Sequence, residues 1–139
     1  IGEGEKKEEL IKLIEHLNLK DNVFLIGYKN NVYKYLINCK CFILSSLWED
    51  PGFVLIEAGL SNTPILSSNC DYGPVEILEN QKNGFLYESN SQTSLLDNFS
   101  EFINSSNSEL MKKKINLKKK IKVYTGYHHY KTLSKILGI

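Results

Sequence analysis

Two glutamates stand out in residues 45–58, a segment between an expected strand and an expected helix. Glu49 and Glu57 are separated by seven residues, and Glu57 lies within an otherwise apolar stretch. Because burying an isolated carboxylate is costly, Glu57 needs a partner or water. Sugar and ribose hydroxyls would be suitable partners. The structural alternative is that Glu49 caps the helix and Glu57 pairs with a lysine.

The start of the same helix is expected to bind an anion. We expect Glu49 and Asp50 to cap it, Pro51 to occupy its first turn and Gly52 to let the backbone approach a ligand closely. The free N–H groups of residues 52–54 would then point at a negatively charged group, as at other helix N-termini.

Short apolar runs alternate with helical patterns along the chain. Strands are expected at 23–26, 41–44, 64–67 and 84–87, and helices at 10–17, 32–39, 53–60, 75–78, 95–103 and 109–137, the last interrupted near Gly126. The apolar runs lack polar alternation, which predicts buried strands in a parallel α/β sheet. Ligands of such sheets bind beyond the carboxyl ends of the strands, so candidate loops are 2–5, 27–28, 45–53 and 68–74.

These segments resemble a known enzyme family. Glu49 and Glu57 match the E-x7-E pattern of retaining glycosyltransferases of the GT-B fold, in glycosyltransferase family 4. Further matches in the family's order are the segments 2–4, 23–27, 42–46, 57–65, 73–76 and 83–86. The sequence departs from the family at Thr63, where glycine is usual, and at Gly73, which stands without a second glycine. The resemblance covers residues 1–104.

The resemblance implies a donor-binding role for eight residues. These are Gly2, Gly4, Tyr28, Glu49, Gly52, Phe53, Val54 and Glu57. Glu57 would bind the ribose hydroxyls, and Glu49, the catalytic candidate, would hold the donor sugar without acting as a nucleophile. The amides of residues 52–54 would face the sugar and diphosphate, and Tyr28 would border the base.

The implied fold is a Rossmann-like parallel sheet flanked by helices. Residues 1–139 would form one nucleotide-sugar-binding domain, the C-terminal half of a GT-B enzyme without its first strand and helix, with C-terminal helices at 109–139. The last helix would cross back to an N-terminal domain that binds the acceptor. We therefore expect this chain alone to be inactive.

The implied reaction is transfer of a hexosyl unit, with retention, from a UDP- or GDP-sugar to a saccharide or lipid-linked acceptor. Polysaccharide or lipopolysaccharide synthesis at the cytoplasmic side of the membrane would fit this chemistry. The alternatives are a GT-B-like nucleotide-sugar epimerase and a non-catalytic nucleotide-binding module. No cofactor and no metal are expected.

Charge, hydropathy and cysteine spacing argue against a nucleic-acid-binding protein, a membrane-spanning protein and a zinc protein. A net charge of +1 gives no global field for nucleic acid. No apolar run approaches the roughly 20 residues of a membrane span. Cys39 and Cys41 form a C-x-C pair that predicts small buried side chains rather than a zinc site.

Trp48 and Phe53 could line the sugar pocket or belong to the core. His16, His128 and His129 are expected on helices, away from the candidate loops.

Seven lysines cluster between Lys112 and Lys122. The simpler interpretation is a solvated helix face. The functional alternative is peripheral contact with an anionic membrane, since each lysine near such a surface contributes about 1 kcal/mol.

Overall fold

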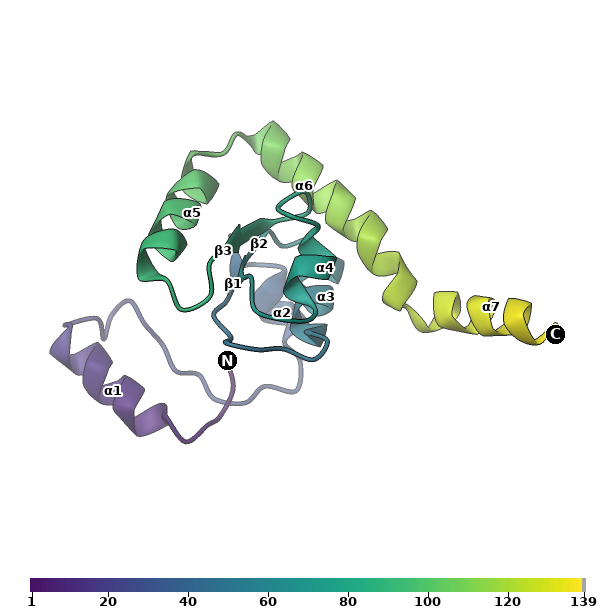
Figure 1. Cartoon of the computed structure of the whole chain (residues 1–139). Coiled ribbons are helices and arrows are strands. Elements are labelled where there is room, and N and C mark those ends of the chain that lie inside the picture. Colours follow the sequence, from purple (N-terminus) through teal and green to yellow (C-terminus); the bar gives the residue numbers. More distant parts are fainter. Residues whose placement is uncertain (139) are drawn as a thin grey trace. The chain divides into compact units, whose positions relative to one another are not determined.

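The computed structural model, drawn in Figure 1, describes residues 1–138. The chain divides into two compact units: unit 1 spans Ile1–Tyr35 and unit 2 spans Leu36–Ile139. Helix α2 (Tyr33–Leu36) lies at the division. The expectation of one domain over residues 1–139 stays a prediction.

Unit 1 contains the first expected helix but not the first expected strand. Helix α1 (Lys7–His16) confirms the apolar periodicity of residues 10–17. Residues 23–26 form no strand, and Phe24 is 68% exposed. None of the described residues of unit 1 is buried. The prediction of a buried strand is wrong within this unit because a strand needs a hydrogen-bonded neighbour, and the described part of unit 1 contains none.

Unit 2 is built on a parallel sheet of three strands in the order β1-β2-β3. They are β1 (Phe42–Leu44), β2 (Ile65–Ser68) and β3 (Phe85–Tyr87). Ile43 pairs with Leu66 across the first ladder. The predicted α/β class with parallel strands is confirmed. Every residue of β2 is buried, whereas Ile43 in β1 is 47% exposed. The predicted burial of residues 41–44 is therefore wrong. Both β1 and β3 are edge strands, but α4 and α5 cover β3, and β1 has less cover of this kind among the described residues.

The helices of unit 2 follow the predicted pattern. They are α3 (Phe53–Leu60), α4 (Pro74–Leu78), α5 (Gln92–Asn104), α6 (Asn107–Lys120), the 3-10 helix η1 (Ile121–Tyr124) and α7 (Gly126–Leu137). The break near Gly126 is confirmed, since Thr125 accepts a hydrogen bond from the His128 amide and starts a new helix. The expected helix 32–39 is reduced to the four residues of α2.

Two contacts join the helices of unit 2 to its sheet and to one another. The rings of Phe85 in β3 and Phe102 in α5 meet edge to face, with centroids 5.7 Å apart. Gly59 lets α3 approach the following helices, because a Cβ there would lie 2.9 Å from Cδ1 of Ile121. These contacts hold the sheet between α5 on one side and α3 with α6 on the other (Figure 1).

Two lysines of the predicted basic cluster contact other residues of unit 2 instead of lying free in solvent. Lys113 lies over the Phe85 ring, 4.5 Å from its centroid, and donates a hydrogen bond of 2.9 Å to the Gly84 carbonyl. Its burial lowers the pKa of the ammonium group. Lys120 pairs with Glu79 at 3.3 Å. The simple interpretation of one solvated face is therefore wrong for Lys113 and Lys120.

The cysteines differ in accessibility more than the sequence predicts. Cys39 is exposed, which contradicts the expected burial of the C-x-C pair, whereas Cys41 is half-buried and Cys70 is buried. Cys39 lies beyond the short helix α2 and before β1, so the two side chains do not share a strand face. Burial, with Cys39 nearby, raises the pKa of the Cys41 thiol to about 12.

We expect one of these thiols to react rapidly with iodoacetamide. The thiolate is the reactive form, so a raised pKa keeps Cys41 protonated and slow at about pH 8. Mass spectrometry should find a single rapid adduct, on Cys39, in the folded chain and three adducts in denaturant. Loss of the rapid adduct in Cys39→Ser is the control. Rapid modification of Cys41 in the folded chain would contradict the prediction.

Candidate functional site

The loop between β1 and α3 contains the candidate catalytic residue Glu49. Helix α3, which follows it, begins differently from the prediction. Gly52 is the N-cap of α3, with φ 80° and ψ 49°, and no side chain caps the helix. Pro51 precedes the cap rather than lying in the first turn. The expectation that Glu49 or Asp50 caps α3 is therefore wrong. A left-handed N-cap favours glycine, which has no Cβ to clash.

Glu49 is instead held inside its own loop. Its carboxylate accepts a 2.6 Å hydrogen bond from the Ser46 hydroxyl. Ser68, at the end of β2, donates a 2.6 Å hydrogen bond to the Ser46 carbonyl. Tyr87, at the end of β3, donates one of 3.0 Å to the Leu44 carbonyl. The end of β1 and the start of the loop that carries Glu49 are thus bonded to the other two strands.

Ser68 and Tyr87 are positioning residues that sequence reasoning missed. The available signal was a hydroxyl at the carboxyl end of each apolar run. Such groups, once buried, need hydrogen-bond partners, and backbone carbonyls of an adjacent loop can provide them.

Glu57 lies one turn into α3, between two buried residues, Ile56 and Ala58. Its side chain is half-buried. Within residues 1–138, its carboxylate takes part in no hydrogen bond or ion pair, so the alternative of a lysine partner is not realised. A half-buried charge without a partner is unfavourable, which makes Glu57 a candidate for contact with an external group.

Gly73 brings the β2–α4 loop against the β1–α3 loop. It has φ 73° and ψ −75° and precedes α4. A Cβ at this position would clash with the Pro51 carbonyl oxygen and lie 2.8 Å from its carbonyl carbon. Only glycine therefore permits this approach, and it aligns two of the candidate loops at the carboxyl edge of the sheet.

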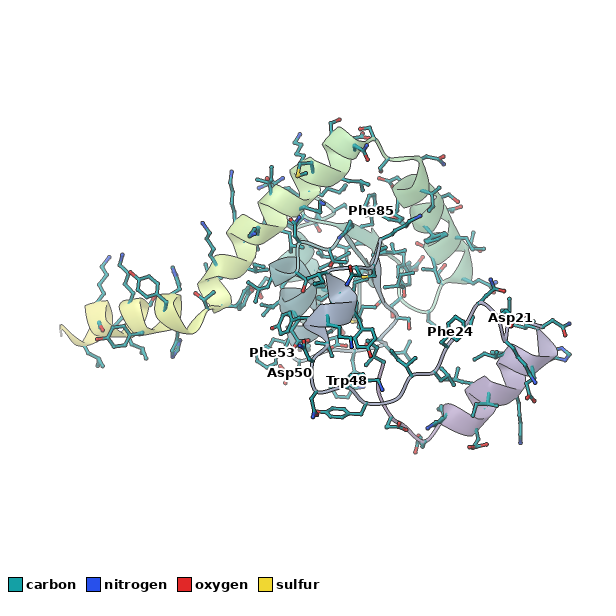
Figure 2. The ribbon with its side chains drawn as sticks, turned by 180° about the vertical axis from the view of Figure 1, so that it is seen from behind. Asp21, Phe24, Trp48, Asp50, Phe53 and Phe85 are labelled. Atoms are coloured by element: carbon teal, nitrogen blue, oxygen red, sulfur yellow. The ribbon has the colours of Figure 1, made fainter. Side chains whose placement is uncertain are left out.

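Aromatic side chains at this edge are open to solvent. Trp48 is 74% exposed and Phe53 is 66% exposed, so neither belongs to the core. Figure 2 labels both, together with Asp50. Tyr72, in the β2–α4 loop, is 79% exposed and has φ 62°, which is uncommon for a residue with a side chain. Sequence reasoning did not single out Tyr72 as a candidate.

Unit 1 contains the remaining predicted donor residues. The Gly2 amide donates a 3.0 Å hydrogen bond to the Gly27 carbonyl, which joins the 2–4 turn to the segment before Tyr28. Gly2, Gly4 and Gly27 line a cavity of about 290 Å³, together with Lys6 and Lys7. Tyr28 is 70% exposed.

The predicted site residues thus form two groups, one in each unit. Unit 2 brings together Glu49, residues 52–54 and Glu57 on one loop and the helix that follows it. Unit 1 brings together Gly2, Gly4 and the Gly27-Tyr28 segment. The three histidines lie on helices, as expected: His16 on α1, and His128 and His129 on α7. The described residues contain no group of three or more histidine, cysteine or acidic side chains that could hold a metal.

Comparison with known proteins decides the family. Residues 1–123 match the family model described as Glycosyl transferases group 1. The chain belongs to this family. The E-x7-E pair and the glycines that carried the resemblance all lie within the matched range.

Two of the similar proteins are glycosyltransferases whose names give their acceptors. The chain is 36% identical over 104 residues, 75% of its length, to poly(ribitol-phosphate) alpha-N-acetylglucosaminyltransferase of Staphylococcus aureus, of which it covers 21%. It is 35% identical over 68% of its length to N-acetylgalactosamine-N,N'-diacetylbacillosaminyl-diphospho-undecaprenol 4-alpha-N-acetylgalactosaminyltransferase of Campylobacter jejuni, of which it covers 26%. The chain therefore spans about a fifth to a quarter of the length of these relatives.

Solved structures agree on the fold. A TarM variant from S. aureus, in complex with fondaparinux, alpha-GlcNAc-glycerol and UDP, matches 97% of this chain and 27% of its own, with a TM-score of 0.81 and 29% identity. HepE from Anabaena, in complex with UDP-glucose, matches 95% of this chain and 38% of its own, with a TM-score of 0.79 and 23% identity.

Proposed function

We propose that this chain provides the donor-binding part of a retaining hexosyltransferase that uses a UDP-sugar. The observation that carries the proposal is Glu57, a half-buried carboxylate without a partner within residues 1–138, in a helix that otherwise buries apolar side chains. In this proposal the ribose hydroxyls of the donor are its partners. The TarM structure with UDP supports uridine over guanosine as the base.

Each group at the carboxyl edge of the sheet has a role in the proposal. The amides of residues 52–54 face the diphosphate at the start of α3, where backbone N–H groups are not yet used within the helix. As the sugar–phosphate bond breaks, negative charge grows on the diphosphate, and these fixed dipoles stabilise it. Glu49, held by Ser46, contacts hydroxyls of the donor sugar and keeps it oriented.

In unit 1, the proposal gives donor-binding roles to Gly2, Gly4 and Tyr28. Gly2 and Gly4 allow close passage of the backbone beside the donor, and Tyr28 borders the base. The acceptor is a saccharide or a lipid-linked saccharide, bound by another part of the whole protein. The name of the C. jejuni relative supports a lipid-linked acceptor, and a relative from Rhizobium meliloti that is named for lipopolysaccharide core biosynthesis supports a role in polysaccharide synthesis.

Calorimetric titration of the chain with UDP, GDP and ADP tests the proposal. We expect UDP to bind and the two purine nucleotides to bind at least about tenfold more weakly, a difference of roughly 1.4 kcal/mol. Binding of UDP-glucose that competes with UDP would support the same site. Equal affinity for all three nucleotides would contradict a uridine site, and tighter binding of GDP would replace the proposed donor with a GDP-sugar.

A further inference from the structure

The outward side of α6 and η1 combines positive charge with exposed apolar groups. We define the basic face as Lys112, Lys118, Lys119 and Lys122 together with Met111 and Ile115. The opposite side of the same segment buries Leu117 and Ile121. Since residues three, four and seven apart share one side of a helix, the six members of the face lie together.

The ammonium groups of the four lysines in the basic face do not stabilise the fold through direct contacts. Lys113 and Lys120 lie on another side of the segment. Lys113 donates a hydrogen bond to a backbone carbonyl, and Lys120 forms an ion pair with Glu79. The ammonium groups of these four lysines take part in no hydrogen bond or ion pair with the described residues. The face thus presents four positive charges without a direct partner in the described structure.

Acidic residues are scarce along this segment, and one from another helix, Glu101 of α5, lines the same hollow as Lys112. Glu109 is the one acidic residue of the sequence 107–124, and it is bound to Ser106 in the capping box at the start of α6. A helix face stabilised by pairing with its own surroundings would alternate charges of both signs. A uniform positive face is instead complementary to an extended anionic surface.

The apolar members of the face indicate what kind of anionic surface fits. Met111 is 49% exposed and Ile115 is 48% exposed, and both lie among the lysines. A soluble polyanion would leave these side chains in water. At a lipid bilayer they can enter the boundary between headgroups and acyl chains, while the lysine stems extend so that their ammonium groups stay at the headgroups.

We infer that the basic face of α6 and η1 docks the chain peripherally on an anionic lipid bilayer. The contact is peripheral because none of the helices within residues 1–138 is long and apolar enough to cross a membrane. It involves neither the nucleotide site nor the carboxyl edge of the sheet, so it stands independently of the proposed donor. Docking would hold the chain close to acceptors carried by lipids.

Co-sedimentation of the chain with vesicles tests the inference. We expect binding to phosphatidylcholine vesicles in which about a third of the lipid is phosphatidylglycerol, and little binding to phosphatidylcholine alone. High salt should weaken the binding, because charges in water are screened within about 3 Å at 1 M. Equal binding to both vesicle types, or none to either, would overturn the inference.

Two triple variants distinguish vesicle binding through the basic face from an effect of the total charge of the chain. Lys112→Gln/Lys118→Gln/Lys119→Gln should lower the partition coefficient by about 100-fold, from the contribution of three lysines near the surface. The matched control Lys12→Gln/Lys40→Gln/Lys131→Gln removes the same charge from exposed positions elsewhere and should have a much smaller effect. Equal losses in both variants, each with the circular dichroism spectrum of the unsubstituted chain, would overturn the inference.

A change in the apolar members distinguishes a bilayer from a soluble polyanion. Met111→Ser/Ile115→Ser keeps every charge but should reduce vesicle binding several-fold, while leaving any binding to inorganic polyphosphate unchanged. Unchanged vesicle binding, with tight polyphosphate binding, would assign the face to a soluble polyanion instead.

Discussion

Glu57→Gln is expected to weaken the affinity of the chain for UDP about 100-fold. Glutamine keeps the size of the side chain but loses charge-assisted hydrogen bonds to the ribose hydroxyls, and about 3 kcal/mol corresponds to such a loss. The folded chain itself should be as stable as before or slightly more stable. The reason is that the substitution removes a half-buried carboxylate without a partner in the described structure. Calorimetry and thermal unfolding measure the two quantities.

The opposite signs of these effects separate a binding role from a structural one. A glutamate that only stabilised α3 would lower the unfolding temperature when replaced. The matched control is Asp97→Asn, which neutralises an exposed carboxylate on α5 and should change neither quantity. Wild-type UDP affinity in Glu57→Gln would remove Glu57 from the proposed donor site.

Gly73→Ala is expected to destabilise unit 2 and also to impair nucleotide binding. The added methyl group meets the backbone of Pro51, and alanine is strained at φ 73°. Since rigid backbone rather than a flexible side chain opposes it, we expect a cost of about 3 kcal/mol, or a melting temperature lower by about 10 °C. The β1–α3 loop must then move, and the amides of residues 52–54 lose their alignment.

Gly126→Ala is the control for this substitution. Gly126 begins α7, and a Cβ there meets no atom within 4 Å in the described structure. Alanine should therefore be neutral or slightly stabilising, because glycine is the poorer helix former. A Gly73→Ala chain with the melting temperature and UDP affinity of the unsubstituted chain would show that the two loops do not depend on their contact.

The elements of unit 2 could be predicted because each carries a local signal. The apolar periodicity of residues 95–103 predicted α5, and the apolar runs at 41–44 and 64–67 predicted β1 and β2. The predicted helix 53–60 matches α3 at both ends. Local signals failed at residues 23–26, where an apolar run alone predicted a strand. A strand also requires a neighbour, and that neighbour is not a property of the segment.

The order of the motifs in the sequence predicted the family, because Glu49, Gly52 and Glu57 keep the family's spacing around the start of α3, and Gly73 follows in the next loop of unit 2. Tertiary structure alone decided how the site is held. Ser68 and Tyr87 bond to Ser46 and Leu44, Gly73 approaches Pro51, and Lys113 donates to the Gly84 carbonyl. These contacts join residues far apart in sequence. Such pairings depend on distances in space, which no spacing along the chain encodes.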